Sequence, residues 1–417
     1  MVVDNGRAEF LRGITMKRLY QSIIEDHFEQ CNQMLFLCGP RQVGKTTLIK
    51  AYQKEIAVHK YFNWDNVDHR DIILSGVEPV IQTLKLDVPK VEKPLLVFDE
   101  IHKYKQWKNY IKGLYDEYKG RINIIVTGSA KLNVFRKGGD SLMGRYFLYR
   151  MHPLTVGELL RQNFSNEMIA KPKKITNTEF KRLIEFGGYP EPFIKKNLRF
   201  YQRWQNLRRE QLIHEDIRNL AQVQELAQLE VLARLLANQT GQLVNNANLA
   251  KKIRVSEKTI SRWFNVLEDF YYCFRVRPWS KNVSRSLIKE PKVYCWDWAL
   301  VNNDGARIEN FVASHLLKTV HLWTDAGFGE FELYFLRDKD QKEVDFLIAK
   351  DGAPWIIIEV KKSDSGRLSK CVQHFQKQLK APHVFQVAFD LPYLDIDCFK
   401  LKEPKIVPAS TLLSQLF

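Results

Sequence analysis

The chain has 417 residues, a hydrophobic content of 45% and a formal net charge of +16 at pH 7. Its length predicts two to four domains, and its hydrophobic content is that of globular domains with large cores. No run of about 18 apolar residues is present, which excludes membrane-spanning helices. The charge surplus favours a polyanionic partner, nucleic acid before an acidic membrane surface, although some proteins are merely basic.

The cysteines and the first residues bear on the compartment. Six cysteines are scattered without a Cys-x-x-Cys pair, so we expect reduced thiols and no zinc site. The first residues include charged side chains and lack the apolar segment of a signal sequence. We therefore expect a cytoplasmic protein without a membrane partner.

A phosphate-binding loop follows a helical pattern over residues 15–30. The apolar run Met34–Cys38 predicts a buried parallel strand, Gly39-x-x-x-x-Gly44-Lys45-Thr46 follows it, and a helical pattern comes next. Backbone N–H groups of such a loop surround phosphates at a helix N-terminus. The lysine reaches the β- and γ-phosphates, and the threonine hydroxyl binds Mg²⁺. We expect ATP and Mg²⁺ to contact Gly39, Pro40, Arg41, Gln42, Val43, Gly44, Lys45, Thr46 and Thr47.

The next segments alternate between strand and helix, which predicts a doubly wound parallel sheet. The strands are expected at 58–64, 94–98 and 122–127, with a helix at 107–118.

Two acids end the second of these strands. Asp99 is predicted to hold the Mg²⁺ water shell, and Glu100 to polarise the attacking water. Thr127 or Ser129, at the end of the next strand, could sense the γ-phosphate or only cap the strand.

Downstream residues carry a resemblance to a known family. They are Gly144, Arg145, Pro153, Leu154 and Glu158, then Gly187-Gly-Tyr-Pro-Glu191, with segments near Trp263 and Lys361. The chain resembles AAA+ ATPases in which a Gly-Pro-Arg-x-x-Gly-Lys-Thr loop precedes a C-terminal domain of unknown function. The resemblance implies a helical lid around residue 187 and Arg145 as an arginine finger, with Arg136 as the alternative. A plain surface arginine also fits. A finger acting in trans implies a homo-oligomer, a hexamer being one candidate.

A helix-turn-helix is predicted between residues 246 and 270. Ser256 is expected to cap the second helix, whose apolar stripe is Ile260, Trp263, Phe264 and Leu267. The opposite face presents Lys258, Arg262 and Asn265, which suit phosphates and base edges. A basic β-rich segment follows, so we expect a winged helix that binds DNA. A module that only packs against its neighbours is the alternative.

From residue 307 onward the pattern predicts helix, three strands, helix and strand. Glu309 lies in the first helix, Asp345 in the second strand, and Glu359-Val360-Lys361 ends the third. Acids with a lysine at the mouth of a small sheet are what metal-dependent phosphodiester hydrolysis requires.

This αβββαβ order resembles the PD-(D/E)xK nucleases, which have the restriction-endonuclease-like fold. The resemblance implies that Glu309, Asp345 and Glu359 bind Mg²⁺ and that Lys361 assists catalysis. The proline of the motif is absent, because Val344 precedes Asp345, and no Gln-x-x-x-Tyr element follows Lys361. A nuclease fold with a silent site is the alternative.

The turn Asp351-Gly352 makes the nuclease geometry testable. A regular two-residue hairpin would pair Asp345 with Ile358 and point one acid to the wrong face. Convergence of Asp345 with Glu359 therefore requires an odd loop or a bulge, and we predict one of these.

The sequence thus predicts an α/β chain of four parts. They are a P-loop AAA+ core with a parallel sheet (1–155), a helical lid (156–220), a winged helix (221–290) and a nuclease-like domain (291–417). The favoured function is ATP-dependent DNA binding and processing with metal-dependent cleavage. The alternative is a nucleotide-switched DNA-binding or scaffolding protein that does not cut, and RNA remains open as the ligand.

Overall fold

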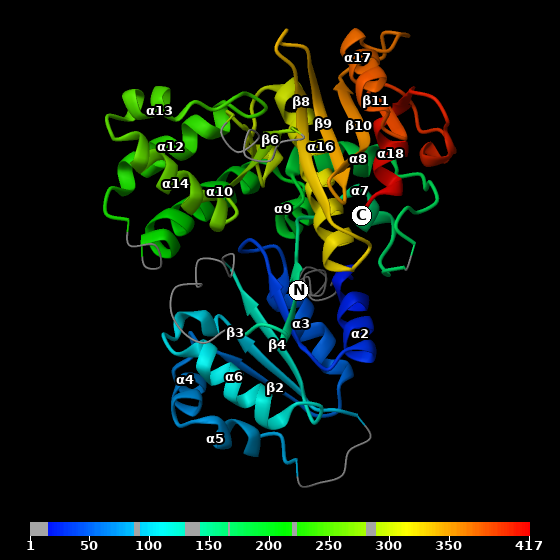
Figure 1. Cartoon of the computed structure of the whole chain (residues 1–417). Helices are drawn as coiled ribbons and strands as arrows, with labels where there is room; N and C mark the ends of the chain where they lie inside the picture. The colour runs from blue at the N-terminus through cyan, green and yellow to red at the C-terminus, as the bar shows by residue number, and fades with distance from the viewer. Residues whose placement is uncertain (1–15, 87–91, 130–141, 166, 219–222, 281–288) are drawn as a thin grey trace, which may run out of the picture.

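The computed structural model describes residues 16–86, 92–129, 142–165, 167–218, 223–280 and 289–417. Figure 1 shows the N-terminal sheet at the bottom, a helical module at the upper left and a second sheet at the upper right. Among the described helices, none is long and apolar enough to cross a membrane.

The N-terminal sheet has five parallel strands in the order β2-β3-β4-β1-β5. The predicted doubly wound parallel sheet is therefore confirmed. Its edge strand β5 was not predicted, since its half-buried residues lack a long apolar run. The strands are β1 (Met34–Cys38), β2 (His59–Asn63), β3 (Leu95–Asp99), β4 (Asn123–Gly128) and β5 (Tyr146–Arg150).

Helices cover both faces of this sheet. Leu35 and Leu37 of β1 pack in one core with α2 and α3, and Phe36 packs in another with α6. Burial on both faces explains why β1 reads as a continuous apolar run. The elements are α2 (Tyr20–Gln30), α3 (Lys45–Tyr52), η1 (Gln53–Glu55), α4 (Val67–Leu74), α5 (Val77–Gln82), η2 (Ile101–Lys103) and α6 (Trp107–Tyr118).

A helical region joins the two sheets. The predicted helix-turn-helix is confirmed as α13 and α14, and the Ser256 side chain accepts a hydrogen bond from the Thr259 backbone N–H at 3.0 Å. The π-helical turn η4 continues from α10. Its Leu212, Ile213 and Ile217 share one hydrophobic core with α12, α13 and α14. The helices are α7 (Val156–Leu160), α8 (Asn177–Phe186), α9 (Pro190–Lys195), α10 (Leu198–Glu210), η4 (Gln211–Ile217), α12 (Leu226–Asn238), α13 (Asn246–Ile253) and α14 (Glu257–Asp269).

The second sheet has seven strands in the order β12-β11-β10-β9-β8-β6-β7. The predicted αβββαβ order is present as α16, β8, β9, β10, α17 and β11. The strands are β6 (Cys273–Pro278), β7 (Lys292–Cys295), β8 (Phe331–Arg337), β9 (Glu343–Lys350), β10 (Ala353–Lys361), β11 (His383–Ala388) and β12 (Lys405–Pro408). The helices are η5 (Trp298–Leu300), α16 (Asp304–Asp325), α17 (Lys370–Leu379), η6 (Cys398–Lys400) and α18 (Ala409–Gln415).

The two strands after the helix-turn-helix, β6 and β7, belong to this second sheet. They pair with each other in an antiparallel hairpin, and Arg277 and Pro278 of β6 pair with Tyr334 and Phe335 of β8. The sheet therefore runs across the boundary that the sequence predicts near residue 290.

The hairpin of β9 and β10 contains the predicted irregularity. Its turn pairs Lys350 with Ala353, and the register shifts by one residue between Pro354 and Ile356, so that Phe346 pairs with Ile358. Continued by one residue, this register places Asp345 opposite Glu359. The prediction of a bulge that aligns the two acids is confirmed.

Candidate functional site

The phosphate-binding loop closes between β1 and α3. The Lys45 ammonium donates hydrogen bonds to the carbonyls of Gly39 at 2.6 Å and Pro40 at 2.8 Å. Gly44 has φ 104°, a left-handed conformation that favours glycine. A Cβ at Gly39 would lie 2.3 Å from the Met151 carbonyl oxygen. The loop thus requires both glycines, as the motif predicts.

Asp99 lies at the carboxyl end of β3 and faces the start of α3. Its carboxylate accepts a hydrogen bond from the Thr46 hydroxyl at 3.2 Å, and further ones from the hydroxyls of Tyr61 and Thr127. The structure therefore brings together Thr46 and Asp99, the two residues predicted to bind Mg²⁺. Hydroxyl and carboxylate oxygens suit this hard cation. Tyr61 was missed, because only the pairing of β2 with β3 shows that it faces Asp99.

Glu100 follows in a left-handed conformation with φ 58°. Its Oε2 accepts a hydrogen bond from the Ser129 hydroxyl at 3.2 Å and lies 3.4 Å from His102 Nε2. Burial raises the pKa of Glu100 although Lys45 opposes the shift, and burial lowers the pKa of His102 to about 3. A raised pKa makes the ionised Glu100 carboxylate a stronger base toward an attacking water. Ser129 thus contacts the predicted catalytic acid.

The remaining loop residues face different surroundings. Val43 is buried, whereas Gln42 and Thr47 are exposed. The guanidinium of Arg41 forms an ion pair with Asp216 of η4, and its Nη1 lies 3.7 Å from Glu215. Burial raises the pKa of Asp216 to about 6 although Arg41 opposes the shift. A residue predicted to bind nucleotide thus also contacts the helical module.

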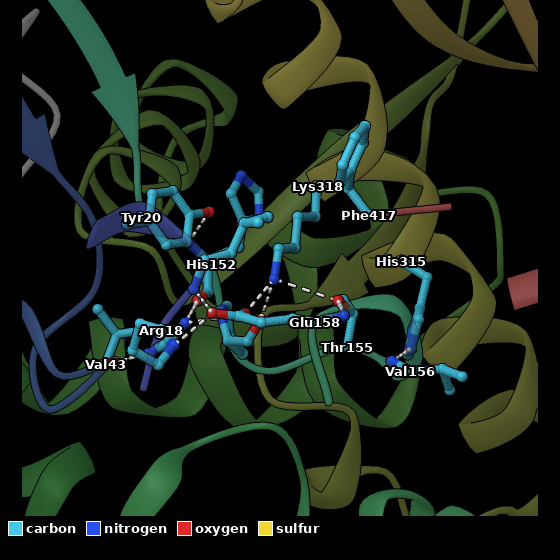
Figure 2. A network of polar contacts seen from close by, with 12 residues as sticks. Arg18, Tyr20, Val43, His152, Thr155, Val156, Glu158, His315, Lys318 and Phe417 are labelled. Atoms are coloured by element: carbon cyan, nitrogen blue, oxygen red, sulfur yellow. Dashed lines mark hydrogen bonds and ion pairs between the residues drawn. The ribbon is translucent and has the colours of Figure 1, made fainter. Parts of the chain in front are cut away.

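A buried charge network contacts the loop at Val43 (Figure 2). Arg18 donates to the Val43 carbonyl, to the His152 carbonyl at 2.7 Å, and from Nε to Glu158 at 2.6 Å. Glu158 also pairs with Lys318 of α16, whose Nζ lies 3.1 Å from the Thr155 hydroxyl. These contacts connect the phosphate loop to the helix that carries Glu309.

Glu158 should be important for stability. Burial opposes its ionisation, but Arg18 and Lys318 outweigh burial and lower the pKa of Glu158 to about 2. Removing one partner of a buried ion pair leaves uncompensated charge, so Glu158→Gln should lower the free energy of unfolding by about 3–5 kcal/mol at pH 7. Denaturant titration measures this difference.

The lowered pKa of Glu158 also determines how its contribution to stability depends on pH. A lowered pKa stabilises the fold above the unfolded value of 4.5, and this stabilisation is lost as the pH falls toward about 2. The difference between wild type and Glu158→Gln should therefore shrink below pH 4.5. Glu29→Gln, an exposed change on α2, is the matched control. Equal stability of wild type and Glu158→Gln at pH 7 would contradict the prediction.

Comparison with protein families agrees with this site. Residues 31–160, which contain the loop, Asp99 and Glu100, match the AAA domain family. Residues 31–160 form a P-loop ATPase domain. Residues 177–306 and 304–390 match two families described as domains of unknown function, DUF8612 and DUF4143.

Relatives of similar length exist in archaea and bacteria. The uncharacterized protein MJ1544 of Methanocaldococcus jannaschii is 26% identical over 85% of this chain and 81% of its own length. The uncharacterized protein Rv2008c of Mycobacterium tuberculosis is 22% identical over 82% of this chain and 73% of its own length. Among solved structures, the Walker-type ATPase PABY2304 of Pyrococcus abyssi matches 68% of this chain and 93% of its own, with 14% identity and a TM-score of 0.41.

Arg145 lies far from the phosphate loop of its own ATPase domain. It directly precedes Tyr146, which pairs with Met34 at the amino end of β1, whereas the loop follows the carboxyl end of that strand. Its side chain forms two hydrogen bonds with Asp116, at 2.7 and 2.9 Å. Catalysis within one chain is therefore excluded by position, and a role in trans stays a prediction. Arg136, the alternative finger, lies outside the described residues.

The predicted DNA-binding face of α14 is exposed. Lys258, Arg262 and Asn265 are all exposed, opposite the buried stripe of Ile260, Trp263, Phe264 and Leu267. The Asn265 side-chain oxygen already accepts a hydrogen bond from Arg275 at 2.6 Å, so it is less available to a base edge.

The C-terminal acids converge, as predicted. Asp345 Oδ2 accepts a hydrogen bond from the Val360 backbone N–H at 2.8 Å, and Lys361 Nζ donates to Glu359 Oε1 at 2.6 Å. Glu359 Oε2 is buried and has no hydrogen-bond partner among the described residues. Burial, and then the charge of Asp345, raises the pKa values of Glu309 and Glu359 to about 7.

The cluster is nevertheless unlike the predicted Mg²⁺ site. Lys292 of β7 extends its ammonium between Glu309, at 3.3 Å, and Asp345, at 3.7 Å. Across the part of the chain that the structure describes, no group of three or more Asp, Glu, His or Cys side chains is arranged to hold a metal ion. The predicted metal role of Glu309, Asp345 and Glu359 does not fit this arrangement. Lys292 could not be recognised from the sequence, because only the pairing of β6 with β7 brings it to the acids.

Proposed function

We propose that this protein is an ATP-hydrolysing switch whose nucleotide state controls DNA binding by its helix-turn-helix. The ion pair between Arg41 and Asp216 carries the proposal. Arg41 belongs to the loop that surrounds the phosphates, so a bound nucleotide competes with Asp216 for its guanidinium. Asp216 lies on η4, whose apolar side chains pack in the core of the DNA-binding helices.

The DNA side of the proposal rests on charge. The exposed Lys258 and Arg262 project from the second helix, and the chain has an excess of 16 positive charges. Contacts from basic side chains to phosphates supply most of the affinity for nonspecific DNA and make it dependent on salt.

DNA binding should depend on Arg262 and on nucleotide. Arg262→Ala should weaken binding of a labelled duplex, and each lost phosphate contact should lower the log–log salt slope by roughly 0.9. In the Glu100→Gln protein, Mg²⁺ and ATP should shift the affinity by about 5–150-fold, a typical coupling between two sites. Adding Asp216→Asn should reduce that shift. Fluorescence anisotropy over a salt series measures all three.

Arg121→Ala, an exposed change in the ATPase domain, is the control for loss of one positive charge. Unchanged affinity and slope in Arg262→Ala would return the helix-turn-helix to a packing role. An affinity that does not respond to nucleotide would reject the switch. If the protein bound duplex RNA more tightly than duplex DNA, RNA would replace DNA as the proposed partner.

Metal-dependent DNA cleavage is the second candidate function. The alignment of Asp345 with Glu359, together with Lys361, favours it. The position of Lys292 opposes it, so we propose a C-terminal domain that supports DNA binding without cutting. Incubating the protein with Mg²⁺, ATP and linear or branched DNA distinguishes the two, since cleavage products that Asp345→Asn abolishes would establish the nuclease.

A further inference from the structure

Lys292 provides a positive charge inside the acidic cluster of Glu309, Glu343 and Asp345. Its Nζ lies 2.8 Å from Glu343 Oε1, 3.3 Å from Glu309 Oε1 and 3.7 Å from Asp345 Oδ1. The residue is only 3% exposed. A buried ammonium is stable only when acids compensate it, and three of them surround this one.

Each of the three acids around Lys292 also has an oxygen engaged by another donor. Glu309 Oε1 also accepts a hydrogen bond from the Tyr294 hydroxyl at 2.7 Å, and Glu343 Oε2 accepts one from Arg337 at 2.7 Å. Asp345 Oδ2 is held by the Val360 backbone N–H. A divalent cation needs several of these oxygens at about 2.0–2.6 Å, and it would stand within a few ångströms of a positive charge.

We propose that Lys292 is the resident cation of this cluster, occupying the position of a divalent metal and keeping such metals out. The ammonium neutralises the acids as a metal would. It supplies no open coordination position and cannot activate water as a Lewis acid. The C-terminal domain therefore keeps the αβββαβ arrangement and its aligned acids without metal-dependent cleavage.

The test measures the affinity of the protein for Mn²⁺ in the absence of nucleotide and DNA. The electron paramagnetic resonance signal of free Mn²⁺ gives the fraction of the ion that is not bound. We compare wild type, Asp345→Asn, Lys292→Met and the double variant Lys292→Met/Asp345→Asn. Wild type and Asp345→Asn should bind Mn²⁺ equally weakly. Lys292→Met should gain one site, tighter by about 100-fold or more, because the repulsion of two close positive charges is removed. The double variant should lose that site.

Two controls separate charge from general disturbance. Lys292→Arg keeps the positive charge and should gain no site, and Lys289→Met removes an exposed lysine just before the same strand. The proposal is overturned if wild type binds Mn²⁺ tightly and Asp345→Asn abolishes the binding. It is also overturned if a folded Lys292→Met protein gains no site.

If Lys292→Met fails to fold, as thermal melting would show, the comparison of wild type with Asp345→Asn still decides. Because the measurement involves neither ATP nor DNA, its outcome is independent of the proposed switch.

Discussion

Replacing Glu100 with glutamine should reduce ATP hydrolysis by about 10²–10⁴-fold while ATP stays bound. Glutamine preserves the shape of the side chain and can still accept the hydrogen bond from Ser129, but it cannot take a proton from water. The lysine and the hydroxyl expected to bind phosphate and Mg²⁺ are untouched. Phosphate release measures hydrolysis, and a fluorescent ATP analogue measures binding.

Lys45→Ala is the informative comparison, because it should weaken nucleotide binding itself. The substitution removes the buried Lys45 ammonium, which donates hydrogen bonds to two carbonyls of the loop. Glu117→Gln, an exposed acid on α6 of the same domain, should leave both measurements unchanged. Normal turnover in the Glu100→Gln protein would remove Glu100 from its assigned role.

The second large effect concerns Arg145 as an arginine finger in trans. Such groups contribute about 10³–10⁵ in rate, so Arg145→Ala should be nearly inactive. Its guanidinium would have to leave Asp116 and reach the ATP site of a neighbouring subunit. Mixing Arg145→Ala with Glu100→Gln should partly restore activity, because some interfaces then combine an intact Arg145 with an intact Glu100.

Subunit exchange must be shown in the same mixture, for example by energy transfer between labelled chains. If subunits exchange and no activity returns, Arg145 is not a finger in trans. Arg121→Ala controls for loss of an exposed arginine from this domain. Sedimentation with ATP would show whether the chain assembles, as the trans role requires.

The ATP site could be predicted because its chemistry is local in sequence. The phosphate loop is one continuous segment, and Asp99 and Glu100 end a strand whose apolar run marks it as buried. The carboxyl ends of parallel strands meet at one edge, so the contact of Asp99 with Thr46 follows from topology. The bulge before Glu359 was predictable for a related reason, since only a register shift lets two acids share a face.

The missed residues depend on contacts between distant segments. Lys292 meets Glu309 and Asp345 only because β7 pairs with β6 and lies beside α16, and a lone lysine gives no sign of this in the sequence. No sequence motif singles out Arg18 or Lys318, although each is at most 4% exposed. Their burial follows from the packing of α16 against the ATPase domain. The hydrophobic periodicity of the sequence does not indicate this packing.

The strand pairing of β6 with β8 has a practical consequence for dissecting the protein. An expression boundary drawn at residue 290 would cut the β6–β7 hairpin and leave one side of β8 unpaired. Open strand edges promote association between chains, so both fragments should be prone to aggregate. A cut near residue 160, after the last residue that matches the AAA family, leaves this sheet whole. The helix-turn-helix and the C-terminal strands should therefore be expressed as one fragment, and they should have been retained together in evolution as one structural unit.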